Sequence, residues 1–236
     1  MGLGKTIQSI SFLHQLWKQP CTNIRGPHLI VAPLSLIRQW ESEFSIWSPE
    51  TNCIVLHGTS ESREILLQNE FYFQPPFTPK AVAVNLKKKG IYKFDVVLTT
   101  YEMAMKEKGL FSKIKWEVFI IDEAHRLKNN SSKIFEMLQA IPREHCVMLT
   151  GTPLQNKTDE LWALLHFADR KKFPVLAEFS EKFGDLRDAA DVARLHNLLK
   201  PYLLRRIKED VEKSLPPKEE TIIEVFTPHC IHVCIF

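Results

Sequence analysis

Short apolar runs rich in β-branched residues alternate along this chain with longer amphipathic stretches. The runs predict strands at Leu29–Ala32, Cys53–Leu56, Val96–Thr99, Val118–Ile121 and Val147–Leu149. The amphipathic stretches predict helices over Ile7–Trp17, Leu36–Phe44, Ser62–Gln68, Lys133–Gln139, Asp159–Phe167 and Val192–Lys200. Strands that alternate with helices are typical of the α/β class, in which helices flank a central, mostly parallel sheet.

Two regions depart from this alternation. Residues 70–93, which include Pro75, Pro76 and Pro79, predict an irregular surface excursion before the strand at Val96. From Phe173 onward the strand pattern stops, and helices separated by loops are expected. We therefore expect a helical C-terminal appendage that packs on the sheet domain.

The first residues have the pattern of a phosphate-binding loop, and Ile7–Trp17 follows as its helix. The residues expected to bind a nucleotide here are Gly2, Leu3, Gly4, Lys5 and Thr6. Backbone N–H groups and the Lys5 ammonium suit phosphates, the Thr6 hydroxyl suits Mg²⁺, and the helix dipole favours bound anions. Because a strand normally precedes such a loop, we expect a sheet truncated at its first strand.

A second motif, Asp122-Glu123-Ala124-His125, comes directly after the apolar strand that ends at Ile121. Asp122 is expected to hold Mg²⁺ opposite Thr6, and Glu123 to orient and deprotonate the attacking water. We predict that His125 couples this site to a neighbouring loop. An acidic helix N-terminus would explain the two carboxylates equally well if the motif stood alone. Together with the phosphate loop, it predicts an ATPase with Glu123 and Lys5 as catalytic residues and ATP and Mg²⁺ as cofactors.

A third segment, Thr150-Gly151-Thr152, follows the strand at Val147–Leu149. One glycine between two threonines predicts a tight turn whose hydroxyls face the site. Because ligands of parallel sheets lie at the carboxyl ends of the strands, all three motifs are expected at one edge. We predict that Thr150, Gly151 and Thr152 sense the nucleotide through His125.

Composition narrows the class of protein only slightly. The chain is 44% hydrophobic and 25% charged, which is ordinary for a globular protein, and its net charge of +3 does not identify a nucleic-acid partner. No apolar stretch reaches the length of a membrane span, so no membrane partner is expected. The five cysteines have no paired spacing, which indicates reduced thiols, and the tail from His229 to Cys234 fits no zinc pattern.

Six blocks of sequence carry a resemblance to the N-terminal ATPase lobe of Swi/Snf-type chromatin remodellers, a RecA-like P-loop NTPase lobe of helicase superfamily two. They are Met1–Gln8, Val31–Phe44, Leu98–Glu102, Ile120–Asn129, Met148–Asn156 and Tyr202–Lys218. Two further stretches, Phe183–Leu186 and Lys218–Val225, look most like the chromodomain-helicase-DNA-binding (CHD) branch. The resemblance implies a RecA-like lobe over residues 1–170, a helical extension over 171–225 that leads to a second ATPase lobe, and an unrelated tail over 226–236.

The resemblance also implies a function. Proteins of this kind hydrolyse ATP to translocate on duplex DNA and remodel nucleosomes, with histones as partners, in the nucleus. The DNA-contacting positions that it implies are Pro33, Ser35, Thr99, Thr100 and Tyr101. Contacts with phosphates rather than bases suit a motor that moves on arbitrary sequence.

Two other interpretations stay open. An RNA helicase with an Asp-Glu-Ala-His box usually carries a Ser-Ala-Thr segment where this chain has Thr150-Gly151-Thr152. A non-catalytic DNA- or nucleotide-binding fragment is favoured by the expected lack of the first strand. In this superfamily the second lobe supplies arginine fingers, so we expect the isolated chain to hydrolyse ATP negligibly.

Overall fold

The structure is a computed structural model that describes residues 3–19, 21, 24–75, 77–151, 158–183 and 189–206 of the 236-residue chain. The chain divides into two compact units, Met1–Leu203 and Leu204–Phe236. The elements described below all belong to the first unit.

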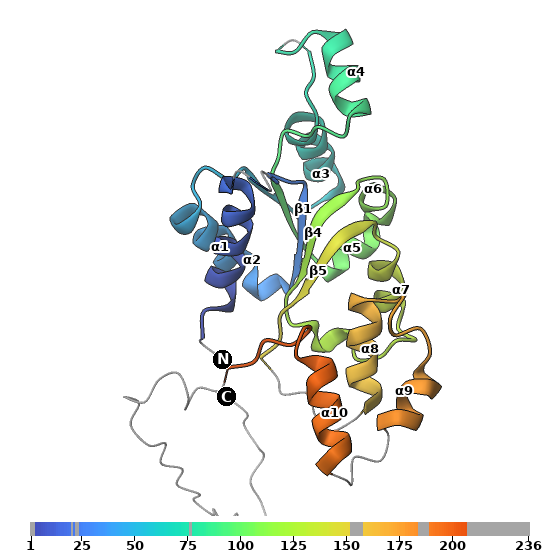
Figure 1. The fold of residues 1–236 in the computed structure, drawn as a ribbon. Coiled ribbons are helices and arrows are strands. Elements are labelled where there is room, and N and C mark those ends of the chain that lie inside the picture. Colours follow the sequence, from blue (N-terminus) through green and yellow to red (C-terminus); the bar gives the residue numbers. More distant parts are fainter. Residues whose placement is uncertain are drawn as a thin grey trace, which may run out of the picture. The chain divides into compact units, whose positions relative to one another are not determined.

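A five-stranded parallel sheet forms the centre of this unit (Figure 1). Its strands are β1 (His28–Ala32), β2 (Cys53–Leu56), β3 (Val96–Thr100), β4 (Trp116–Ile121) and β5 (Arg143–Met148), in the order β2-β3-β1-β4-β5. In the central register, Leu29 lies between Val97 of β3 and Phe119 of β4. The expected α/β class is confirmed, and every predicted strand is present.

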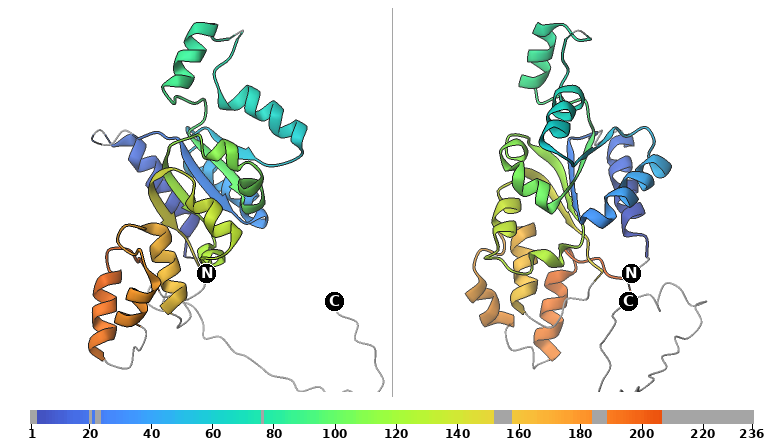
Figure 2. Two further views of the ribbon diagram at one scale, coloured as in Figure 1. Left: turned by 90° about the vertical axis from the view of Figure 1, so that its right-hand side faces the viewer. Right: turned by 180° about the vertical axis from the view of Figure 1, so that it is seen from behind.

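Helices cover both faces of the sheet, which explains why β1 and β3 are buried along their whole length. Figures 1 and 2 show α1 (Lys5–Lys18) and α2 (Leu34–Trp47) on one face, and α5, α7 and α8 on the other. The remaining helices and turns are α3 (Ser60–Leu66), η1 (Leu67–Phe71), α4 (Lys80–Lys88), α5 (Tyr101–Lys106), α6 (Lys108–Phe111), η2 (Ala124–Leu127), α7 (Lys133–Gln139), α8 (Thr158–Ala168), α9 (Leu176–Phe183) and α10 (Ala189–Leu199). None of the helices in the described ranges is long and apolar enough to cross a membrane.

Alternate residues of β1 divide the core into two clusters. Ile30 and Ala32 pack with α1 and α2, where Ile10, Trp40 and Phe44 are buried. Leu29 and Val31 face the larger cluster on the other side of the sheet, to which α5, α7 and α8 contribute. The period of two along a strand therefore sets which helices each strand residue contacts.

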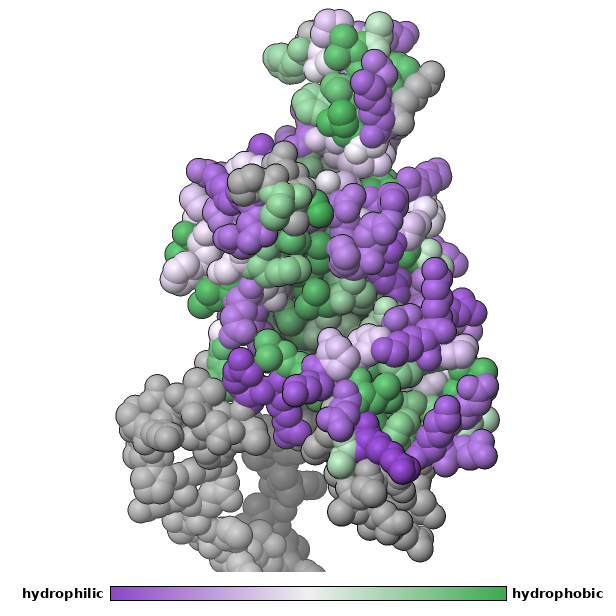
Figure 3. All heavy atoms as spheres, viewed as in Figure 1, coloured by the Kyte–Doolittle hydropathy of each residue, from purple (hydrophilic) through white to green (hydrophobic). Residues whose placement is uncertain are grey.

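The edge strand β5 begins earlier than the predicted strand at 147–149. Its first residues, Arg143, Glu144 and His145, are polar, and the last two are exposed. The Arg143 guanidinium donates hydrogen bonds of 2.8–3.3 Å to four backbone carbonyls, including that of Phe167. Within the described residues β5 pairs only with β4, and Figure 3 shows an apolar hollow on the face where Figure 1 draws β5. A strand with one open edge need not be apolar throughout, which is why sequence pattern missed its start.

The expectation of an irregular excursion over 70–93 is wrong for residues 80–88, which form α4. Pro79 precedes this helix, where its fixed φ and missing N–H cost little. Val82 and Val84 on α4 are about half exposed, and their spacing of two resembles a strand pattern more than a helix. The sequence also gave no expectation for α5 or α6, which follow β3 without an intervening loop.

Helices α9 and α10 share the larger core cluster with the sheet. Phe173, Phe179, Leu195 and Leu199 are buried in it. The expected division after residue 170 falls inside the first unit and stays a prediction. The predicted tail over 226–236 lies outside the described residues, as does the part of the predicted extension beyond Arg206.

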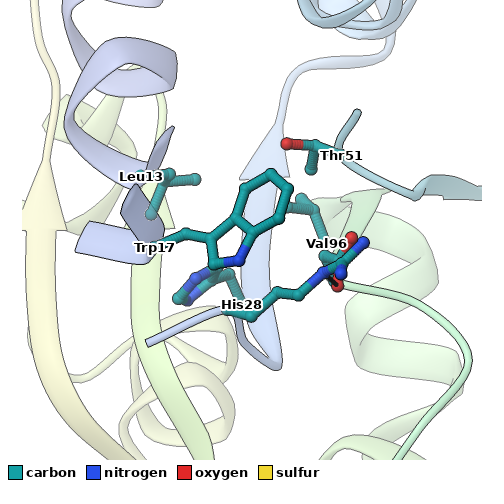
Figure 4. A pocket seen from close by; sticks show the side chains of 7 residues that line it. Leu13, Trp17, His28, Thr51 and Val96 are labelled. Carbon is teal, nitrogen blue, oxygen red and sulfur yellow. Dashed lines mark hydrogen bonds and ion pairs between the residues drawn. The ribbon is translucent and has the colours of Figure 1, made fainter. Parts of the chain in front are cut away.

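A small cavity of about 10 Å³ lies at the amino ends of β1 and β3, at the opposite end of the sheet from the motifs (Figure 4). It is lined by Leu13, Trp17, Arg25, His28, Thr51, Asp95 and Val96. Arg25 pairs with Asp95 at 2.7 Å, whereas His28 is 2% exposed and its Nδ1 has no partner among the described residues. Burial lowers the pKa of His28 from 6.5 to about 4, because desolvation disfavours the charged imidazolium.

The lowered pKa of His28 makes stability depend on pH. The unfolded chain binds a proton at this residue below pH 6.5, whereas the folded chain does so only near pH 4. The stabilising contribution is therefore complete above pH 6.5 and is lost as the pH falls towards 4, by about 3 kcal/mol in total. Denaturant titrations between pH 7 and 4 should show this loss in the wild-type chain and a shallower dependence in His28→Gln. The same replacement at exposed His57 should keep the wild-type slope, and an unchanged slope in His28→Gln would contradict the assignment.

Candidate active site

The amino end of α1 has the features of an anion-binding site. Gly4 is its N-cap in the left-handed conformation, at φ 72° and ψ 33°. No side chain in the described residues caps the helix, and its first turn has no acidic residue, so its first N–H groups remain available. Lys5 and Thr6 are half-buried in this turn, and Gln8 Nε2 donates to the Leu3 carbonyl at 2.8 Å. A left-handed residue at this position favours glycine. The predicted phosphate ligand Gly2 lies outside the described residues.

The end of β4 presents a buried carboxylate. Asp122 is 4% exposed, and its N–H donates to the carbonyl of Val31 on β1 at 2.8 Å. Its Oδ2 accepts a hydrogen bond from Trp40 Nε1 at 2.9 Å, and its Oδ1 accepts one from the N–H of Glu123, also at 2.9 Å. Each carboxylate oxygen retains a second lone pair, so the group is oriented but can still accept a cation.

Glu123 has an unusual backbone. At φ 52° and ψ 49° it is the only residue other than glycine with a positive φ in the described part of the chain. The next N–H, from Ala124, donates to the Leu149 carbonyl at 2.8 Å, and η2 begins there. The left-handed step turns the chain sharply after β4 and leaves the Glu123 side chain half-buried.

His125 lies beside the Glu123 carboxylate. Its Nδ1 is 3.0 Å from Glu123 Oε2, an ion pair only when the imidazole is protonated. The structure thus brings the predicted catalytic carboxylate and one predicted coupling residue together. Thr150 and Gly151 follow β5 and are half-buried, and the N–H of Leu149 donates to the Ile121 carbonyl at 2.8 Å. The third coupling residue, Thr152, lies outside the described residues.

The residues predicted to contact DNA fall into two groups. Ser35 is exposed and Pro33 half-exposed at the amino end of α2. Thr99, Thr100 and Tyr101, by contrast, are buried at the end of β3 and the start of α5. The Thr99 hydroxyl donates to the Leu56 carbonyl at 2.9 Å, and the Thr100 hydroxyl caps α5 by accepting from the Met103 N–H at 3.1 Å.

Tyr101 has an internal role that the sequence did not suggest. It is completely buried, and its hydroxyl donates to the Asp122 carbonyl at 2.6 Å. Burial raises the pKa of this phenol, so the group remains a proton donor. The Arg126 guanidinium lies over the Tyr101 ring, 4.7 Å from its centre.

Trp40 is the other residue of the site that sequence reasoning missed. Its place in the amphipathic pattern of α2, between Ile37 and Phe44, explains a buried apolar side chain without any polar role. The only available signal was its indole N–H, because a buried tryptophan usually donates to a partner.

The motifs gather at one end of the sheet. Figures 1 and 2 show the start of α1, the turn after β4 and the end of β5 at the same end of the strands. Ligands of parallel sheets bind at this end. The oxygens of Asp122 and Thr6 form the hard donor set that Mg²⁺ prefers, and the open turn of α1 suits phosphates. The residues present therefore fit an Mg-nucleotide.

Known proteins resemble this chain over nearly its whole length. The profile of the SNF2-related domain family matches residues 1–229. The chain is 46% identical over 231 residues to the CHD3-type chromatin-remodeling factor PICKLE of Arabidopsis thaliana. It is 49% identical over 225 residues to chromodomain-helicase-DNA-binding protein 9 of Homo sapiens. Each alignment covers 95% of this chain but only 16% and 7% of the relative, respectively.

A solved structure has the same fold. The SWI2/SNF2 ATPase core of Sulfolobus solfataricus in complex with double-stranded DNA superposes with a TM-score of 0.70 at 28% identity. The match covers 91% of this chain and 40% of that one. With the family profile spanning nearly the whole sequence and close to half of all residues identical to CHD-type relatives, the chain belongs to the SNF2-related domain family.

Proposed function

We propose that this chain is the ATP-binding lobe of a CHD-type chromatin-remodelling motor, which hydrolyses ATP in the nucleus and moves on the duplex DNA of nucleosomes. The observation that carries the proposal is the shared position of two motifs at one end of the sheet. The open first turn of α1 carries Lys5 and Thr6, and the end of β4 carries Asp122 and Glu123. Membership of the SNF2-related family and identity to CHD-type relatives support the remodelling role.

In this proposal each residue acts on a different part of the nucleotide. The N–H groups of the first turn of α1 bind phosphate oxygens, and Lys5 adds a positive charge there. Thr6 and Asp122 hold Mg²⁺, which when bound neutralises phosphate charge. Glu123 orients a water and accepts its proton, and His125, 3.0 Å away, adjusts the position of the Glu123 carboxylate.

We propose that duplex DNA is contacted at the carboxyl end of the sheet, where the nucleotide motifs also lie. Ser35 and Pro33 are accessible at the start of α2, where helix N–H groups can bind a phosphate. Because the side chains of Thr99, Thr100 and Tyr101 are buried, a phosphate contact near that segment would come from the exposed Arg126 guanidinium or from backbone N–H groups. The bound DNA in the Sulfolobus solfataricus structure supports a duplex as the substrate class.

A non-catalytic nucleotide- or DNA-binding fragment is the second candidate. The open edge of β5, seen within the described residues, favours it for the 236-residue polypeptide. The intact Lys5, Asp122 and Glu123 favour hydrolysis once the lobe is joined to the rest of a motor. Hydrolysis therefore distinguishes the two candidates, and nucleotide binding alone does not.

The first test replaces the proposed general base. We expect Glu123→Gln to reduce DNA-stimulated hydrolysis by about 10²–10⁴-fold while nucleotide affinity stays within a few-fold, since general bases contribute this much. Turnover should be measured on a protein in which residues 1–225 are joined to the sequence encoded on both sides at the same genomic locus. Glu61→Gln, an exposed glutamate in the first turn of α3, is the matched control and should retain full turnover. Wild-type protein that is folded but inactive would favour the binding fragment.

The isolated chain should differ from that longer protein. An arginine finger contributes about 10³–10⁵-fold in rate, and in this superfamily it comes from a second lobe. We therefore expect residues 1–236 alone to hydrolyse ATP at least about 10³-fold more slowly, with or without DNA. DNA-stimulated turnover by the 236-residue polypeptide, measured with radiolabelled ATP, would rule this out.

The DNA contact at α2 can be tested by adding a negative charge. We expect Ser35→Glu to weaken binding of duplex DNA by on the order of tenfold at low salt, equally for unrelated sequences, through repulsion of the phosphates. Fluorescence anisotropy over a salt series measures both the affinity and its slope. Ser42→Glu places the same charge at an exposed position further along α2 and should have little effect. Equal weakening in both variants would argue against a contact at Ser35.

A further inference from the structure

Two donors from outside β4 fix the residues at its end. Trp40 reaches Asp122 from α2, and Tyr101 reaches it from the start of α5. All three residues are at most 4% exposed, so water does not compete for these hydrogen bonds. Neither donor belongs to the two nucleotide-binding motifs.

Trp40 sets the orientation of the Asp122 carboxylate. A carboxylate rotates readily about its last bond, but here each oxygen has its own N–H donor at 2.9 Å. The donor on Oδ1 is the adjacent backbone N–H, whereas the donor on Oδ2 is the Trp40 indole. Without the indole, one oxygen of a buried carboxylate would be left without its hydrogen bond, and the group would reorient or recruit water.

Tyr101 acts on the backbone of the same turn. Its hydroxyl donates at 2.6 Å to the carbonyl of Asp122, the peptide group that immediately precedes the left-handed Glu123. A residue other than glycine persists in this conformation only when its surroundings determine it. The hydrogen bonds from Asp122 N–H to Val31 and from Ala124 N–H to Leu149 hold the two sides of the turn. Tyr101 holds the peptide between them.

Both donors belong to elements that begin at the proposed DNA-facing end. Pro33 is the N-cap of α2, and Thr100 is the N-cap of α5. Buried Tyr101 is covered by the exposed Arg126, whose guanidinium lies over its ring and 3.9 Å from the Glu102 carboxylate. Trp40 and Tyr101 therefore connect α2 and α5 to Asp122 and to the Glu123 turn.

We propose that Trp40 and Tyr101 are positioning residues: Trp40 orients the Asp122 carboxylate towards Mg²⁺, and Tyr101 holds the Glu123 turn in its catalytic geometry. The inference rests on the proposed function of this site. It assigns separate consequences to the two residues, because one acts on the metal carboxylate and the other on the general base.

The role of Trp40 is tested by measuring nucleotide binding to the 236-residue chain. Affinity for a fluorescent ATP analogue is titrated against Mg²⁺, and again in EDTA. In Trp40→Phe we expect the Mg²⁺ concentration for half-maximal enhancement to rise by about tenfold, with the Mg²⁺-free affinity within twofold of wild type. Trp47→Phe is the matched control, because Trp47 lies on the same helix, is half-exposed and donates to Glu43 at 2.7 Å.

The role of Tyr101 is tested by measuring ATP hydrolysis on the longer protein in which residues 1–225 are joined to their flanking sequence. In Tyr101→Phe, which removes one oxygen atom, we expect kcat to fall by about tenfold while KM for ATP and the Mg²⁺ requirement stay within twofold. Tyr92→Phe, at a half-buried tyrosine stacked on Phe94, is the control and should behave as wild type. Melting temperatures of all variants report whether the fold is intact.

The outcomes separate the inference from the function that it rests on. If the wild-type chain shows no Mg²⁺-dependent nucleotide binding, the proposed function fails. If wild type binds and Trp40→Phe keeps its Mg²⁺ requirement, or loses Mg²⁺-free affinity as well, Trp40 is only a core residue and its assignment is overturned. Unchanged kcat, or an equal change in kcat and nucleotide affinity, in folded Tyr101→Phe overturns the assignment of Tyr101.

Discussion

The buried Asp122 carboxylate is the constraint on which the rest of this site depends. A carboxylate with little access to water is costly unless donors satisfy it. Here the donors come from α2 and from the next residue of its own chain, so the carboxylate links the packing of α2 to the turn at Glu123. The pairing of β4 with β1, through the bond from Asp122 N–H to Val31, fixes the depth of the carboxylate. Sheet register, helix packing and site geometry are therefore one connected arrangement.

Sequence pattern predicted the sheet well because its strands are buried on both faces. β1 and β4 are apolar in all but one residue and β3 begins with three apolar residues, so composition alone marks them. β5 was predicted only over its last residues, since Arg143 satisfies its guanidinium with carbonyls that no local pattern reveals. α4 was missed because Val82 and Val84 alternate, while the helix exposes both to solvent instead of burying an apolar stripe.

The candidate site likewise contains residues that the sequence predicted and residues that only the structure shows. Lys5, Thr6, Asp122 and Glu123 were predicted from motif spacing, because phosphate and metal chemistry demand those residue types in that order. Trp40 and Tyr101 were not identifiable as part of the site. An amphipathic helix already explains Trp40, and a DNA-contact role was assigned to Tyr101 from resemblance. Their contacts join residues 82 and 21 positions apart, which only the folded chain reveals.

The two ends of the sheet differ in what their buried polar groups do. At the amino end, one ring nitrogen of His28 has no partner in the described part of the chain and lies in a cavity large enough for about one water molecule. The burial of His28 costs stability at low pH. At the carboxyl end, Asp122 has a donor on each oxygen, and Glu123 keeps a left-handed backbone that costs on the order of 1 kcal/mol or more. Such strain gives the fold no benefit by itself, because a glycine would adopt the turn more easily. Its position next to the oriented Asp122 carboxylate is what motivates the proposed role of Glu123 as the general base, because backbone strain of this kind persists where the surrounding structure holds it.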